Sequence, residues 1–201
     1  MVRKLVGVLG LTAIAYAVLG AADFWETKPF TMWSDQELQQ ITTDSPWAKK
    51  IVIAAAAAGR AGGAADTPVV ISWRSALPMK QALARMQLGL NGAVTPQVRA
   101  LLDQKEAGYV VSVDGLPARL AGSTANIRAD TSIKVGDKTR VGPDEALAQP
   151  SGNNLILGFV FPRAPIASED KTVEFVTRVG AFEIKGVFNL KDMVFHGRLE
   201  M

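Results

Sequence analysis

The single histidine is the first residue of this chain that could carry chemistry. His196 stands in a sequence of 201 residues without cysteine, so a transition-metal site would need carboxylates as its other ligands. Residues 193–201 alternate in polarity, which places His196 opposite Phe195 and on the solvent side with Arg198 and Glu200. A Ser-His-Asp site would have to use this histidine, yet no serine lies in a Gly-x-Ser-x-Gly turn. We therefore expect an exposed histidine rather than a catalytic base.

Paired carboxylates are the other groups that could catalyse a reaction: Asp35 with Glu37, Asp144 with Glu145, and Glu169 with Asp170. Each pair lies at a predicted helix start or turn, where acidic side chains complement the helix dipole or keep a loop solvated. Glycoside hydrolysis needs two carboxyl groups across a cleft, which no spacing here predicts. The sequence has no Asp-x-Asp-x-Asp-Gly loop, so it does not predict a calcium site. We assign no catalytic, cofactor-binding or metal-binding residue, and no cofactor.

A glycine-rich stretch at residues 59–65 raises the possibility of phosphate binding. It lacks the lysine and hydroxyl residue that end a P-loop, and it lacks the glycine spacing of a dinucleotide site. We expect a flexible connection between two strands of a hairpin.

Aromatic residues supply the candidate binding surface. The segment 23–33 is denser in aromatic side chains than a free tail, so we expect it to lie across the domain surface or a sheet edge. An exposed aromatic patch for a partner is the functional alternative. The candidate surface consists of Trp25, Phe30, Trp33, Trp47 and Trp73.

The elements that must position these residues begin directly after the aromatic segment. A capping box of Ser34 and Glu37 predicts a helix over about 35–42. Ser45-Pro46 repeats the start signal and predicts a second helical turn. The apolar run that follows predicts a strand, against which Trp47 should dock.

Two further helices are predicted before the pattern changes. After a strand at 69–74, a helix begins near Ser75 and Pro78, with an apolar stripe of Met79, Leu83, Met86 and Leu90. Thr95-Pro96 begins another helix, with a buried face of Val98, Leu101 and Leu102 and a C-terminal cap at Gly108. The short connection predicts an antiparallel helix hairpin packed on one face of the sheet.

From residue 109 onward the polarity alternates with a period of two. This pattern predicts strands at 109–113, 125–135, 155–161, 173–179 and 182–188, with a helical turn at 142–145. One polar and one apolar face are typical of an antiparallel sheet. We predict an α+β fold with a largely antiparallel β-sheet, two or three packed helices, and a sandwich as the alternative arrangement of the strands.

Residues 1–22 predict an export signal, because Arg3 and Lys4 precede an uncharged apolar run that ends in small residues. An uncleaved membrane anchor at residues 5–22 is the alternative, since about 20 apolar residues span a bilayer. Residues 23–201 then form a single domain in the periplasm or outside the cell. Without Arg3 and Lys4 the net charge falls from +3 to +1, from 20 basic and 19 acidic residues. This balance predicts no nucleic-acid partner.

Three stretches of the chain resemble an uncharacterised family of exported bacterial proteins. They are Ser-Pro-Trp-Ala-Lys at residues 45–49, Trp-Arg-Ser-Ala-Leu-Pro at 73–78, and Leu-Lys-Asp-Met-Val-Phe-His-Gly-Arg-Leu-Glu at 190–200. The resemblance spans most of residues 23–201 and implies that they form one unit. It implies no activity, cofactor or site, because the family has none established.

The function predicted from these patterns is that of an exported cell-envelope protein, a non-enzymatic binding or structural module. The alternative is a carboxylate-based hydrolase acting outside the cytoplasm, which would need two acidic side chains in one pocket. The predicted partner is an envelope protein or ligand of unknown identity. Contact with the membrane is expected only if residues 5–22 remain as an anchor.

Overall fold

The computed structural model describes residues 23–53, 66–89, 92–138, 140–163, 166–167 and 169–201. The predicted export signal and the glycine-rich connection lie outside the described residues. The helices are α1 (Phe24–Thr27), the 3-10 helix η1 (Phe30–Met32), α2 (Asp35–Thr43), α3 (Leu77–Leu88), α4 (Pro96–Asp103) and the 3-10 helix η3 (Ala118–Ser123). The strands are β1 (Asp44–Ser45), β2 (Ala48–Ile53), β3 (Thr67–Trp73), β4 (Gly108–Pro117), β5 (Ser132–Val135), β6 (Glu145–Ser151), β7 (Asn154–Pro162), β8 (Thr172–Val179), β9 (Phe182–Asn189), β10 (Val194–Phe195) and β11 (Arg198–Leu199).

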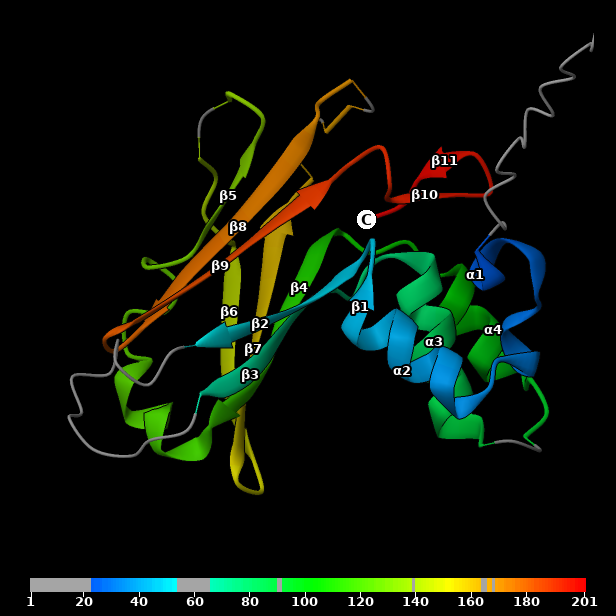
Figure 1. The fold of residues 1–201 in the computed structure, drawn as a ribbon, viewed down its shortest axis with the longest axis horizontal. Coiled ribbons are helices and arrows are strands. Elements are labelled where there is room, and N and C mark those ends of the chain that lie inside the picture. Colours follow the sequence, from blue (N-terminus) through cyan, green and yellow to red (C-terminus); the bar gives the residue numbers. More distant parts are fainter. Residues whose placement is uncertain (1–22, 54–65, 90–91, 139, 164–165, 168) are drawn as a thin grey trace, which may run out of the picture.

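The strands of the described residues form two main sheets and a hairpin. The large sheet has the order β1-β2-β3-β4-β7-β6, the small sheet has the order β5-β8-β9, and β10 pairs with β11. Neighbouring strands in these sheets are antiparallel. Figure 1 shows the two main sheets on one side of the molecule and the α-helices on the other. The predicted α+β fold with a largely antiparallel sheet is confirmed.

The small sheet packs face to face on the large one. Phe175 of β8 lies 5.5 Å from Phe159 of β7, measured between ring centroids. Phe188 of β9 lies 5.8 Å from Trp73 of β3 in the same measure. All four rings are buried. The strands therefore adopt the sandwich arrangement, with an aromatic interior between the two sheets.

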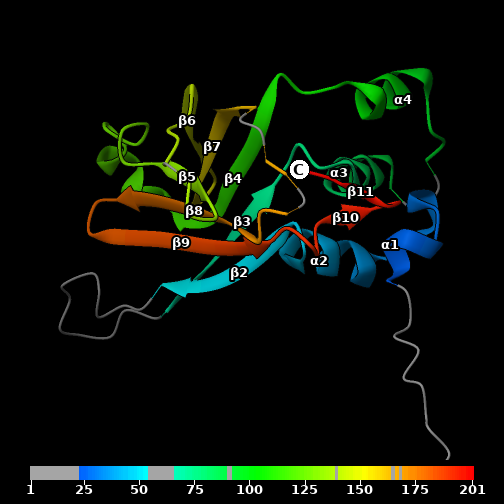
Figure 2. The same ribbon diagram turned by 90° about the horizontal axis from the view of Figure 1, so that it is seen from above.

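The long helices lie beside the strands in both views rather than over one face of the sheet (Figure 2). The capping box of α2 forms as predicted, because Ser34 Oγ accepts the N–H of Glu37 at 3.3 Å and the Glu37 carboxylate accepts the N–H of Ser34 at 2.7 Å. Leu38 and Ile41 form the buried face of α2. Among the described residues, no helix combines the length and hydrophobicity that crossing a membrane requires.

The predicted apolar stripe of α3 is wrong at Met86, while Leu83 is half-buried and Leu90 lies outside the described residues. Met79 is buried, but Met86 is 56% exposed, and the small side chains Ala82 and Ala84 are buried instead. Arg85 is also buried, and its guanidinium donates hydrogen bonds to backbone carbonyls, including that of Gly89 at the end of the same helix. α3 contacts α2 and η1 directly. Small side chains fit at such close contacts, whereas a continuous row of long apolar side chains does not.

The predicted buried face of α4 is also wrong. Thr95 caps the helix as expected, since its Oγ1 accepts the N–H of Val98 at 3.3 Å. No residue of α4 is buried, however, and Leu101 is 48% exposed. The helix ends at Asp103, and Gly108, predicted as its cap, begins β4. α4 is therefore a surface helix.

Ser45-Pro46 begins a hairpin turn, not the second helix that was predicted. Ser45 in β1 lies opposite Ala48 in β2. Its hydroxyl donates to the carbonyl of Ile41 at 2.7 Å and accepts the N–H of Trp47 at 3.2 Å. The serine thus closes the end of α2 and the turn together, and the turn directs Trp47 into the interior, where it is fully buried.

Two further predictions fail around β4 and β5. The strand β4 continues beyond the expected stop at Gly115, through an irregularity between Val113 and Leu116. Gly115 has φ +96, a conformation that favours glycine. Residues 125–130 form turns rather than a strand, because Thr131 Oγ1 donates to the carbonyl of Ile127 at 2.6 Å and local backbone bonds replace a sheet ladder.

The predicted helical turn at 142–145 is absent, since residue 144 is a bend and β6 begins at Glu145. The N–H of Asp144 donates to the carbonyl of Val160 at 2.8 Å, which joins this segment to the large sheet. By contrast, the alternation along β8 and β9 is as predicted, with Val173, Phe175, Thr177, Val179, Ile184 and Phe188 buried.

The hairpin β10-β11 turns at His196 and Gly197. Their φ angles are +48 and +75, and two positive values are typical of a type I′ turn. Met193 and Phe195 are buried and His196 is exposed, as the alternation predicted. The hairpin therefore directs its apolar residues into the core.

Candidate binding site

Four of the five residues predicted as a binding surface lie in the interior. Trp25 is 6% exposed, Trp33 is 1% exposed, and Trp47 and Trp73 are fully buried. Phe30 is half-buried. These four positions therefore do not form the exposed aromatic patch that was the functional alternative, because the indole rings are covered by the elements that they join.

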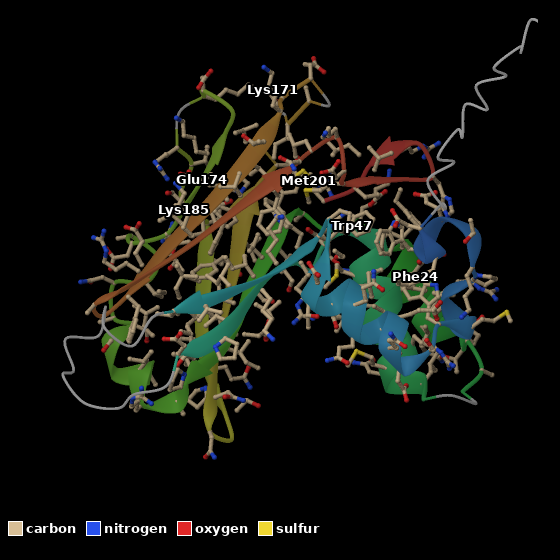
Figure 3. All side chains as sticks on the ribbon, viewed as in Figure 1. Phe24, Trp47, Lys171, Glu174, Lys185 and Met201 are labelled. Carbon is tan, nitrogen blue, oxygen red and sulfur yellow. The ribbon has the colours of Figure 1, made fainter. Side chains whose placement is uncertain are left out.

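Trp47 is the centre of an aromatic cluster that joins distant segments. Its ring centroid lies 5.8 Å from that of Trp25 in α1 and 6.3 Å from that of Phe195 in β10. Its indole N–H donates to the carbonyl of Glu200 at 2.8 Å. Figure 3 shows Trp47 and Met201 near the middle of the molecule, where helices and strands meet, with Phe24 on the helical side. The cluster therefore holds α1, the β1–β2 turn and the C-terminal hairpin together.

His196 has a structural contact on the surface. Its backbone N–H donates to both carboxylate oxygens of Glu26, at 3.1 and 3.2 Å. Its ring Nδ1 lies 3.3 Å from Glu26 Oε2. The histidine thus connects the C-terminal turn to α1.

One member of two of the carboxylate pairs, Glu37 and Asp170, is held by structural contacts. The pKa of Glu37 is held below its ordinary value by the hydrogen bond from Lys28 and by that from the Ser34 backbone. The pKa of Asp170 is lowered by hydrogen bonds from Lys138 and from the Ala167 backbone. Among the described residues, no group of three or more acidic or histidine side chains is arranged to hold a metal ion.

The outer face of the small sheet carries a second set of ion pairs. Glu174 of β8 lies 2.5 Å from Lys185 Nζ and 2.6 Å from an Arg140 nitrogen. Both contacts lower the pKa of Glu174, that of Lys185 more strongly. Figure 3 shows Glu174 and Lys185 on the neighbouring strands β8 and β9. This face is a solvated, charged surface.

A pocket of about 650 Å³ lies where the start of α3, the segment after α4, the start of β4 and the C-terminal hairpin meet. Its lining mixes apolar and charged side chains, including Leu77, Lys80, Leu102, Tyr109, Arg163 and Glu200. The volume lies within the range of small-molecule sites, roughly 300–1,000 Å³. The arrangement could hold a small ligand.

Lys80 forms one wall of the pocket and holds two elements together. Its side chain is only 10% exposed, and its Nζ lies 3.5 Å from Glu106 Oε1. The same ammonium donates to the carbonyl of Gln104 at 2.6 Å. Lys80 therefore ties α3 to the segment that follows α4.

Arg163 and Tyr109 line the same pocket and contact each other. The guanidinium carbon of Arg163 lies 5.3 Å from the centre of the Tyr109 ring, in a cation–π arrangement. Burial raises the pKa of Tyr109 above its ordinary value of 10.0, an effect that the charge of Arg163 partly opposes. The phenol is therefore protonated at neutral pH, and its ring holds the guanidinium at the pocket.

Glu200 links the pocket to the aromatic cluster. Its Oε2 accepts the N–H of Leu77 at 3.4 Å, at the N-terminal end of α3, where a negative charge complements the helix dipole. Its backbone N–H donates to the carbonyl of Met193 at 2.9 Å, and its own carbonyl accepts the Trp47 indole. The pocket wall is thus continuous with the core.

Sequence patterns missed this pocket because its residues come from separated parts of the chain, at 75–80, at 102–109, at Arg163 and Ile166, and at 198–201. None of these segments carries a catalytic or ligand-binding motif. The one available signal was the set of basic residues near the ends of predicted strands, at Arg163 and Arg198.

Comparisons with protein-family models, with curated proteins and with solved structures find no match for this chain.

Proposed function

We propose that this chain is an exported, non-enzymatic binding module of the cell envelope, and that the pocket beside the C-terminal hairpin is its ligand site. The apolar run in residues 1–22 supports export. The pocket of about 650 Å³ supports binding, since concave sites with apolar walls and a few polar groups are the usual places for small ligands.

The contacts of the pocket acids favour binding over hydrolysis. Glu106 is paired with Lys80, and Glu200 accepts a backbone N–H of α3. A general acid and a nucleophile must instead face the scissile bond from two sides. The three acids that line the pocket, Asp103, Glu106 and Glu200, keep the hydrolase as the alternative.

Neighbouring leucines of α4 provide a matched test. Leu102 lines the pocket, whereas Leu101 is 48% exposed and does not. Nile red, an uncharged dye whose fluorescence rises in apolar sites, is titrated into wild-type protein, Leu102→Trp and Leu101→Trp. We expect Leu102→Trp to weaken dye binding at least tenfold, because the larger ring fills the pocket, and Leu101→Trp to bind like wild type.

Far-UV circular dichroism confirms that both variants are folded. The proposal fails if wild-type protein does not bind the dye, or if the two variants bind it equally. Hydrolysis of chromogenic esters or glycosides that is lost in Glu200→Gln would favour the hydrolase instead.

A further inference from the structure

The charged groups of the pocket are not evenly matched, which bears on the ligand that it takes. Four cations line it, namely Lys80, Lys105, Arg163 and Arg198, against the three acids Asp103, Glu106 and Glu200. Lys80 is neutralised by Glu106, and the charge of Glu200 is partly offset by the N-terminal end of α3. After this pairing the lining keeps three basic side chains against two acidic ones, a small excess of positive charge.

The two arginines are positioned to receive an anion. Among the described residues, neither Arg163 nor Arg198 forms an ion pair, although both line the pocket. Arg163 is held over the ring of Tyr109, which restricts its guanidinium before any ligand arrives. A planar guanidinium binds a carboxylate or phosphate through two parallel hydrogen bonds.

The rest of the lining is apolar. Leu77, Leu102, Ile166, Leu199 and Met201 contribute aliphatic or thioether surface to the same pocket. A small inorganic anion would leave this surface uncovered, whereas a ligand with an aliphatic part would bury it and gain about 25 cal/mol for each Å² removed from water.

We infer that the pocket binds an amphipathic organic anion, a molecule with a carboxylate or phosphate head and an aliphatic tail. Arg163 and Arg198 contact the head, and the leucines of α3, α4 and β11 contact the tail. This inference rests on the proposed binding function and names its ligand class.

Displacement of Nile red by three probes with the same ten-carbon alkyl tail tests the inference. Undecanoate, decyl phosphate and uncharged decanol share this tail and differ only in the head. We expect both anions to displace the dye from wild-type protein at concentrations at least tenfold lower than decanol. The more potent anion identifies the head that the pocket prefers.

Variants of the two arginines test whether these side chains bind the anionic head. Arg163→Gln and Arg198→Gln should each weaken displacement by the anions at least fivefold and leave displacement by decanol unchanged. Arg99→Gln removes the same charge from an exposed position of α4 outside the pocket, so it should behave like wild type.

The possible failures are distinguishable. If decanol displaces the dye as well as the anions do, or if the arginine variants match Arg99→Gln, the anionic ligand class is wrong and the binding function stands. If no Nile red binds to the wild-type protein, the proposed function itself fails.

Discussion

Two of the four buried tryptophans differ in whether the indole N–H forms a hydrogen bond. Comparing substitutions at these two positions therefore measures what that bond contributes to stability. Trp47 and Trp73 are both fully buried, and each packs edge-on against other aromatic rings. The indole N–H of Trp47 donates to the carbonyl of Glu200 at 2.8 Å. The indole N–H of Trp73 is buried and has no hydrogen-bond partner within the described part of the chain. Replacing each tryptophan with phenylalanine removes the same atoms from both positions.

The two substitutions should differ in their effect on the free energy of unfolding. Trp47→Phe breaks this hydrogen bond and leaves the Glu200 carbonyl without its donor, at a cost of about 1–3 kcal/mol. Trp73→Phe loses similar apolar contacts but also removes an unsatisfied buried donor, which recovers about 1–3 kcal/mol. We therefore expect Trp47→Phe to be the more destabilising by about 2 kcal/mol or more.

Urea unfolding followed by far-UV circular dichroism measures this difference without relying on tryptophan fluorescence. With a denaturant slope of roughly 2 kcal/mol per M, the midpoint of Trp47→Phe should lie about 1 M below that of Trp73→Phe. Equal midpoints, or a lower midpoint for Trp73→Phe, would refute the hydrogen-bond assignment at both rings.

Three further predictions concern single positions. Ser34→Ala removes the capping hydroxyl of α2 and should lower the unfolding free energy by about 1 kcal/mol in urea titrations. Gly115→Ala should cost more than about 1 kcal/mol, because φ is +96 and the new Cβ would lie 2.7 Å from a carbonyl oxygen of β3. Gly152→Ala, with φ +58 and open space, should cost less. Because the pKa of folded Glu37 is below its ordinary 4.5, its contribution is complete above that pH and lost in more acidic solution, so Glu37→Gln should flatten the acid limb of stability against pH.

The controls for these positions are independent of one another. An unchanged unfolding free energy in Ser34→Ala would contradict the capping hydrogen bonds of Ser34. Equal costs at Gly115 and Gly152 would show that backbone conformation, and not the close approach to β3, decides the cost. An acid limb that keeps its slope in Glu37→Gln would assign the pH dependence to other carboxylates.

Local signals were sufficient where a few neighbouring residues decide the structure. The capping box of Ser34 and Glu37 depends on groups three residues apart, and α2 begins where it predicts. The alternation along β8 was also sufficient, because β5 and β9 flank this strand and its apolar face meets β7 across the sandwich. Both cases need no knowledge of distant parts of the chain.

The same signals failed where distant contacts or competing local bonds decide. Residues 125–135 alternate as cleanly as β8, yet Thr131 bonds back to Ile127 and the first half forms turns. α4 is amphipathic in sequence and contacts α3, yet none of its residues is buried, and Leu101 is left exposed. Alternation and amphipathicity describe what a segment could bury, whereas the fold decides what it does bury.

The candidate pocket was beyond sequence reasoning for the same reason. Lys80 of α3 meets Glu106 in the segment after α4, and Arg163, which follows β7, meets Tyr109 of β4. Neither pair has a spacing that predicts contact, so the pocket appears only when the chain is folded.

The bond between Trp47 and Glu200 spans 153 residues, and it has a consequence for how the chain reaches its native state. A ribosome makes the indole 153 residues before its acceptor, so over that length of synthesis the aromatic cluster has only one of its two sides. The turn after α2 can form at once, but the interior cannot close around it until β10 and β11 arrive. Assembly should therefore be late and concerted, and shortened chains that end before residue 193 should expose Trp47 to solvent.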